Sequence, residues 1–192
     1  TFLEKRTASR LMRPGSPPAT VFTTARLVIA IVPTVGSGAV PAQGRVAAPP
    51  AAQELAGEHP AEYYKRASEL FKEGKKEDAV FIFYLGQLRF RTHLLAKPGG
   101  DPSGDPAIFT ALSEVVGKPI NQYAFGDLPT LAHTVDAVLA YDTANPDTFT
   151  SPTEFAKIHT DVRDGLIAMK TKMLADADRI KASRTKNGLE NR

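Results

Sequence analysis

The stretch of sequence that decides the fold reads Glu77, Asp78, Ala79, Val80, Phe81, Ile82, Phe83, Tyr84 and Leu85. Its aromatic and β-branched residues would suit a buried strand. However, the two acidic residues at its start are typical of a first helical turn, and the chain offers no second segment with which a strand would pair. We therefore predict a helix. Because this helix is apolar on nearly every side, we expect it at the centre of a bundle.

Two more helices are predicted after a loop rich in glycine and proline. Asp105 opens the first as an N-cap residue, and apolar residues follow at helical spacing over 108–116. Asp127 opens the second, with apolar residues along one side over 128–139. Between them, residues 119–125 are expected to form a short helical turn or an irregular loop. Since helical rather than alternating spacing recurs throughout, the predicted fold is an all-α, single-domain helical bundle.

The C-terminal part of the chain predicts one long helix. Residues 151–154 read Ser, Pro, Thr and Glu, which is a capping box with proline at the first helical position. An apolar stripe with steps of three or four follows, formed by Phe155, Ile158, Val162, Leu166, Met169, Met173, Ala177 and Ile180. Asn187 and Gly188 supply a stop. Such a helix would be about 50 Å long, so we expect its last turns to project or fray and residues 185–192 to form a polar tail.

The N-terminal 42 residues have the layout of a secretory signal peptide. They carry five basic residues and one acidic residue, then a short apolar run over 27–35, then small residues up to Ala42. A start at Met12 would give a leader of 31 residues, which is a usual length. We therefore predict cleavage between Ala42 and Gln43 and a periplasmic or secreted protein. A tail with an accidental apolar patch, or a buried strand, is the alternative.

Charge and composition limit the function further. The chain has a net charge of +3, but the predicted leader contributes +4, so the mature part has no basic excess to indicate nucleic-acid binding. The apolar run is far too short to span a bilayer, so no transmembrane anchor is expected in the mature form. The sequence has no cysteine, which excludes disulfides, thiolate zinc sites and cysteine nucleophiles. Residues 43–58, rich in alanine and proline, are predicted to be a flexible spacer before a helical domain over 59–184.

A set of small and bulky residues recurs at fixed positions between Pro60 and His93. These are Tyr63, Ala67, Leu70, Gly74, Ala79, Phe83 and Gly86. On these positions the segment resembles a single tetratricopeptide repeat, a 34-residue pair of antiparallel helices in which small residues allow close helix approach. Two residues differ from the repeat pattern: Lys76 stands where an aromatic residue is usual, and Arg91 stands where a closing proline is usual. No second copy of the repeat follows in the sequence.

A single repeat cannot bury its apolar face, so the resemblance implies a hairpin packed on the later helices rather than a solenoid. A convergent hairpin with the same small residues is the alternative. Residues 60–192 as a whole are also similar to exported bacterial proteins, a similarity that implies no activity.

Motifs for reaction chemistry and metal binding are absent from the sequence. Paired metal-ligand spacing is not found among the four histidines, which are His59, His93, His133 and His159. We expect them to be solvated or locally hydrogen-bonded, with no metal and no cofactor. Asp101 and Asp105 lack the further oxygens of a calcium loop, so turn and N-cap roles are expected for both. No P-loop and no serine-nucleophile elbow is present.

Polar side chains on the central segment form the candidate binding site. Helical spacing places Gln87 beside Arg91, and Arg89 beside His93. Because buried arginines are costly without partners, one interpretation is a structural ion pair with a carboxylate. The other is the polar floor of a groove for a protein partner. That groove would be lined by Tyr63, Tyr64 and Tyr84.

Together these patterns predict an exported protein–protein interaction or scaffolding module without catalytic activity. One alternative is an inhibitor or immunity-type protein in the same compartment. A second is a hydrolytic enzyme whose acid and base, with His133 and Asp136 as candidates, come together only in the fold.

Overall fold

The computed structural model describes residues 46–192, and this part of the chain is helical without strands. The predicted all-α, single-domain fold is therefore confirmed. The helices are α1 (Ala51–Glu54), α2 (Pro60–Lys72), α3 (Lys76–Ala96), α4 (Asp105–Leu112), the π-helical turn η1 (Ser113–Gly117), α5 (Lys118–Ala124), α6 (Leu128–Ala144), α7 (Ala156–Ala175) and α8 (Ala177–Lys186). The predicted leader over 1–42 and its cleavage site lie outside the described residues. Within 46–192, no helix combines the length and the apolar content needed to cross a bilayer.

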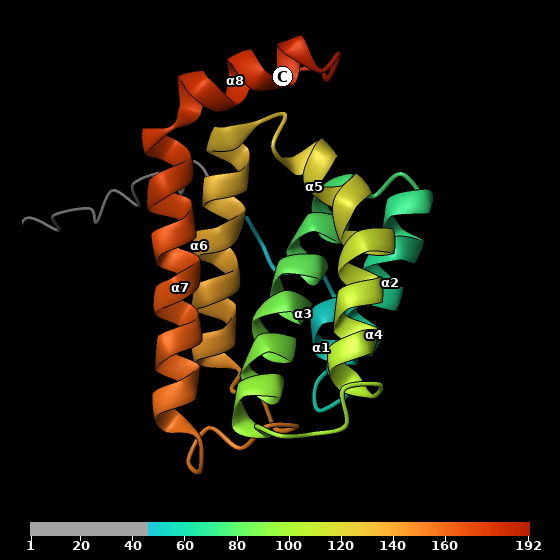
Figure 1. The fold of residues 1–192 in the computed structure, drawn as a ribbon, viewed down its shortest axis with the longest axis vertical. Helices are drawn as coiled ribbons and strands as arrows, with labels where there is room; N and C mark the ends of the chain where they lie inside the picture. The colour runs from blue at the N-terminus through green and yellow to red at the C-terminus, as the bar shows by residue number, and fades with distance from the viewer. Residues whose placement is uncertain (1–45) are drawn as a thin grey trace, which may run out of the picture. The chain divides into compact units, whose positions relative to one another are not determined.

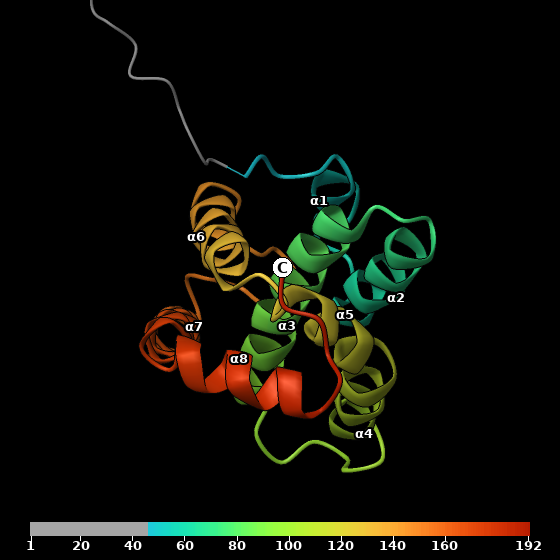
Figure 2. The same ribbon diagram turned by 90° about the horizontal axis from the view of Figure 1, so that it is seen from above.

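Helix α3 lies at the centre of the domain. It packs against α2, α4 and α5 on one side and against α6 and α7 on the other (Figure 1 and Figure 2). Every residue from Ala79 to Leu85 is buried. The helix predicted for this stretch, and its central position, are thus confirmed. So continuous an apolar run is buried because α3 has neighbours on both sides.

Helices α2 and α3 form the hairpin expected over residues 60–93. Gly74 makes the turn with φ +83°, a left-handed conformation that glycine adopts without strain. Gly86 is where the two helices come closest, since a Cβ atom placed there would lie 2.5 Å from Tyr63 Cβ. Arg91 does not end the helix, and α3 continues to Ala96. The relationship to the tetratricopeptide-repeat family itself stays a prediction.

The segment between the hairpin and α6 is more regular than the sequence suggested. Residues 119–125, expected as a turn or loop, lie almost entirely in α5. Asp127 caps α6 as predicted, and its Oδ1 accepts from the Thr130 amide at 3.0 Å. The N-cap role predicted for Asp105 is wrong, because Gly104 occupies the cap position and Asp105 is the first residue of α4. The Asp105 carboxylate is therefore available for contacts outside its own helix.

The prediction of one long C-terminal helix is wrong at both ends. Ser151 Oγ accepts from the Glu154 amide at 3.3 Å, yet turns follow and α7 begins only at Ala156. The helix then breaks at Asp176, and α8 leaves the direction of α7 to run across the end of the domain (Figure 1). This change of direction keeps Ala177 and Ile180 packed on the core, which a straight helix would have carried past it.

The expected polar tail packs back onto the domain instead of projecting. The Arg192 amide donates to Gly126 O at 2.6 Å, and its guanidinium donates to Tyr123 O at 2.9 Å. Arg184 donates to Glu190 O at 2.6 Å. The interpretation of residues 185–192 as a free tail is therefore wrong, because arginine side chains can bind backbone carbonyls that a polar sequence pattern does not reveal.

The flexible spacer predicted over 43–58 is also corrected where the structure describes it. Pro49, Ala51 and Ala52 are buried, and the two alanines belong to α1. The Tyr63 hydroxyl donates to Leu55 O at 2.6 Å, which ties this segment to α2. Composition misled the prediction because small side chains bury little area yet fit closely against an existing core.

Candidate functional site

The three tyrosines predicted to line a groove are core residues. Tyr63 and Tyr64 are fully buried, and Tyr84 is 3 % exposed. Burial raises the pKa of both Tyr63 and Tyr64 to about 12. The Tyr84 hydroxyl donates to Asn121 Oδ1 at 3.0 Å. The interpretation of these rings as a groove wall is therefore wrong, since none of them presents a face to solvent.

Arg89 confirms the ion-pair interpretation. Its Nε donates to Asp142 Oδ1 at 3.3 Å, and its Nη2 donates to Asn145 O at 2.8 Å. Its Nη1 donates to the Tyr63 hydroxyl. Arg163 approaches the other carboxylate oxygen of Asp142, with Nη2–Oδ2 2.6 Å. This network joins α2, α3, α6 and α7 in the interior, so Arg89 is structural rather than the floor of a binding groove.

Gln87 and Arg91 lie nearer the surface than Arg89. Gln87 is half-buried, whereas Arg91 is exposed. Arg91 stands at the edge of a groove between α3 and α7 with a volume of about 380 Å³. The other residues that line this groove are Leu94, Leu95, Asp161, Val162 and Gly165. Of the predicted binding residues, Arg91 is the one that borders an open and mainly apolar surface.

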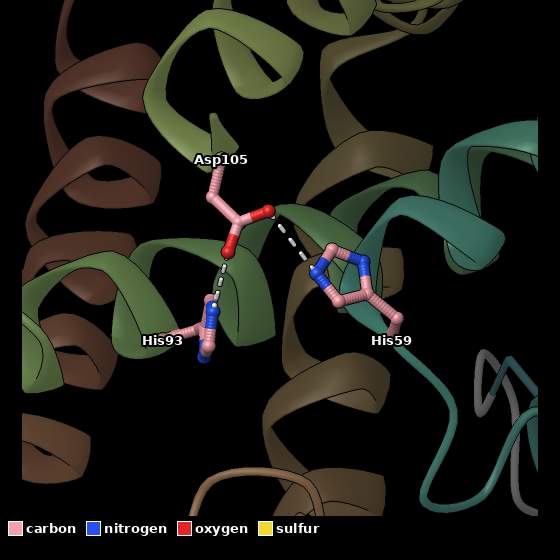
Figure 3. A group of neighbouring side chains, drawn as sticks. All are labelled: His59, His93 and Asp105. Carbon is pink, nitrogen blue, oxygen red and sulfur yellow. Dashed lines mark hydrogen bonds and ion pairs between the residues drawn. The ribbon is translucent and has the colours of Figure 1, made fainter. Parts of the chain in front are cut away.

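His93, the last predicted site residue, belongs to a cluster that the sequence did not reveal. Its Nε2 lies 2.9 Å from Asp105 Oδ2, and His59 Nε2 lies 3.3 Å from Asp105 Oδ1 (Figure 3). The donor atoms of the three side chains all lie within 4.8 Å of one another. They come from three separate places, which are the residue before α2, the C-terminal turns of α3 and the first residue of α4.

Hydrogen bonds determine which tautomer each imidazole adopts. His59 Nδ1 accepts from the Ala61 amide at 3.2 Å, so His59 is the N-cap residue of α2. Its proton must then be on Nε2, the atom that lies 3.3 Å from Asp105 Oδ1. His93 donates a hydrogen bond to Asp105 from Nε2, and its buried Nδ1 has no hydrogen-bond partner among the described residues. The hydrogen bond from His93 stabilises the charged carboxylate and is the main cause that lowers the pKa of Asp105, and the neighbouring His59 imidazole adds to this lowering.

Solvent reaches the cluster from one side. His93 is buried, whereas the side chains of His59 and Asp105 are 34 % and 35 % exposed. His93 and Asp105 also line an open pocket of about 480 Å³, whose other wall is the loop over 97–104. Leu94 borders both this pocket and the α3–α7 groove, so the two hollows adjoin at the C-terminal end of α3.

The remaining candidate residues are not brought together. His159 is buried and bonded to Thr150 O at 3.1 Å, as expected of a locally hydrogen-bonded histidine. Asp101 accepts from the Ser103 amide at 2.9 Å, which confirms its turn role. His133 and Asp136 are exposed beside an open pocket, and Asp136 is paired with Lys170.

Sequence reasoning missed the cluster because spacing along the chain gave no signal. The three residues are separated by a helical hairpin and a glycine-rich loop, whereas metal-ligand motifs are recognised by short repeated intervals. The hairpin prediction offered the one usable indication, because a hairpin places residues 59 and 93 at the same end.

Comparison with protein-family models, with curated proteins and with solved structures found no match to this chain.

Proposed function

We propose that the chain is a non-catalytic, exported helical domain that binds a protein partner at the α3–α7 groove. The observation that carries this proposal is the exposure of Arg91 and Leu95 beside the mainly apolar α3–α7 groove. Leu95 is 56 % exposed, although it lies one turn from the buried core of α3. Aromatic or aliphatic anchors in a pocket, bordered by arginine, are the usual centre of a protein interface.

The lining of the groove indicates what its partner must present. Leu94, Leu95 and Val162 provide apolar contact for one large aliphatic or aromatic side chain. Within the described residues, Arg91 forms no ion pair, whereas Asp161 on the opposite rim is paired with Lys157 at 2.6 Å. The uncompensated charge at the rim is therefore positive. We infer a partner segment that carries an apolar anchor followed closely by an Asp or Glu.

A displayed library of random peptides, selected on the full chain, tests this proposal. We expect the enriched peptides to share an apolar residue near an acidic one. Arg91→Glu should weaken their binding at least tenfold, and changing the peptide's acidic residue to Lys should restore binding to that variant. Lys72→Glu, which makes the same charge change at an exposed position on α2, serves as the matched control and should leave binding unchanged.

Two outcomes would contradict the groove as the binding surface. One is the enrichment of peptides without a shared pattern. The other is equal binding of selected peptides to the parent, Arg91→Glu and Leu95→Asp chains while all three retain the same helical content.

Export is the part of the proposal that rests on the leader pattern. Sequencing the N-terminus of protein recovered from the cell envelope should find Gln43 first. A cytosolic chain that retains residues 1–42 would contradict it.

A further inference from the structure

We propose that His59, His93 and Asp105 bind one divalent transition-metal ion, for which Zn²⁺ is the best match. This inference is independent of the proposed protein partner, and it changes the sequence-based expectation that the histidines serve no metal. Two imidazole nitrogens and one carboxylate oxygen form a donor set that suits zinc, whereas calcium and magnesium prefer oxygen ligands alone.

Two of the three separations between the donor atoms are close to those of a zinc site. Tetrahedral zinc, with bonds of about 2.0–2.1 Å, places its ligand atoms about 3.3 Å apart. Asp105 Oδ1 lies 3.3 Å from His59 Nε2, and Asp105 Oδ2 lies 2.9 Å from His93 Nε2. Because no pair of donor atoms is more than 4.8 Å apart, adjustments of side-chain torsions, without movement of the helices, would bring all three to one ion.

Metal binding requires each imidazole to change its tautomer. The lone pair of Nε2 must face the metal, so the proton has to sit on Nδ1. Each imidazole thereby gives up its contact with Asp105, which the shared ion replaces. For His93 no other hydrogen bond is lost, because its Nδ1 makes none among the described residues. For His59 the cost is the bond from the Ala61 amide, because a protonated Nδ1 no longer accepts. Metal binding thus removes the side-chain hydrogen bond that caps α2, and His59 becomes a metal ligand at the start of that helix.

A fourth coordination position would be open to solvent. The three protein ligands leave one tetrahedral position, and the pocket beside the 97–104 loop borders two of them, His93 and Asp105. Water from this pocket can fill the position. The ion would fasten together the start of α2, the end of α3 and the start of α4, which are otherwise linked here through Asp105 by one hydrogen bond and one 3.3 Å contact.

Zinc titration of the full chain tests the site. The protein should be freed of affinity tags and stripped with a chelator, since both a polyhistidine tag and residual metal would mask the result. Calorimetry should then find one Zn²⁺ per chain. His59→Asn and Asp105→Asn should each weaken binding at least tenfold. His59→Asn is informative because asparagine is itself a good N-cap residue, so the helix start is preserved while the imidazole is lost.

His133→Asn provides the matched control, because it removes an exposed histidine from α6 and should leave zinc affinity unchanged. Nitrogen NMR of the histidine rings adds a reading that a purely structural cluster would not give. On addition of Zn²⁺, the ring protons of His59 and His93 should move from Nε2 to Nδ1, and the Ala61 amide signal should shift.

The proposal is overturned if the parent chain shows no saturable binding of Zn²⁺. It is equally overturned if His59→Asn and Asp105→Asn, each with the helical content of the parent, bind zinc as the parent does. In either case the three side chains form a hydrogen-bonded link between helices and nothing more.

Discussion

Arg89 and Asp142 lie 53 residues apart in the sequence and form an ion pair in the interior, with Nε–Oδ1 3.3 Å and side chains 3 % and 1 % exposed. The pair fixes α3 against α6, two helices that pack side by side. Arg163 on α7 donates to the other oxygen of the Asp142 carboxylate. Three helices therefore meet at a single carboxyl group.

Asp142→Ala should destabilise the domain by about 3–5 kcal/mol, because it leaves the buried charge of Arg89 without a counterion. Urea unfolding followed by circular dichroism would measure the change. Asp161→Ala, which breaks an exposed pair with Lys157, should cost less than about 1 kcal/mol. Similar losses for the two variants would show that the interior network is not what holds α3 to α6.

Gly86→Ala should destabilise the domain by about 1–3 kcal/mol, because its new Cβ would lie 2.5 Å from Tyr63 Cβ and force α2 away from α3. Gly165→Ala is the matched control. It lies within α7, and no atom outside its own helix backbone comes within 4 Å of the place that a new methyl group would take, so alanine should stabilise the helix by about 1 kcal/mol. Thermal melts of the two variants should move in opposite directions. A Gly86→Ala chain that melts like the parent would mean that the hairpin has room to relax.

Alkaline pH should weaken the fold through its buried tyrosines. The pKa of Tyr63 rises from 10 to about 12, mainly because burial disfavours the phenolate. The native state therefore keeps a proton that the unfolded chain releases. The resulting stability is complete below pH 10 and is lost as the pH rises towards 12. Urea unfolding at intervals from pH 9 to 12 would measure this loss.

Tyr63→Phe serves as the comparison, because it removes the ionisable hydroxyl and keeps the ring. It should reduce the pH dependence between 10 and 12 while costing about 1–3 kcal/mol at neutral pH through the lost bonds to Leu55 and Arg89. An unchanged pH dependence in this variant would assign the alkaline loss to other groups.

Sequence patterns predict the fold class and the central helix because these depend on local periodicity. The apolar run over 79–85 follows acidic residues typical of a first helical turn, and the structure has a helix there that is buried all round. Patterns fail at Asp176, where the apolar stripe continues in register although the helix axis turns. Periodicity reports which side of a helix is buried, and it carries no information about where the core ends.

The candidate site is harder to predict than the fold. The sequence correctly leaves two roles for Arg89, which are a structural ion pair and the floor of a groove. Choosing between these roles requires the position of Asp142, which only tertiary packing determines. The cluster around His59 escapes prediction for the same reason. Its members share no short interval, and Asp105 matches a capping pattern although Gly104 takes the cap position instead.

The position of α3 has a consequence for how the domain is made. This helix is complete at Ala96, but α6 and α7, which cover its second side, begin only at Leu128 and Ala156. A growing chain can therefore close the α2–α3 hairpin long before the rest of its cover exists. During that interval one apolar side of α3 is open to other chains or to a chaperone. The helix that gives the finished domain its core is thus the part of the nascent protein most in need of protection.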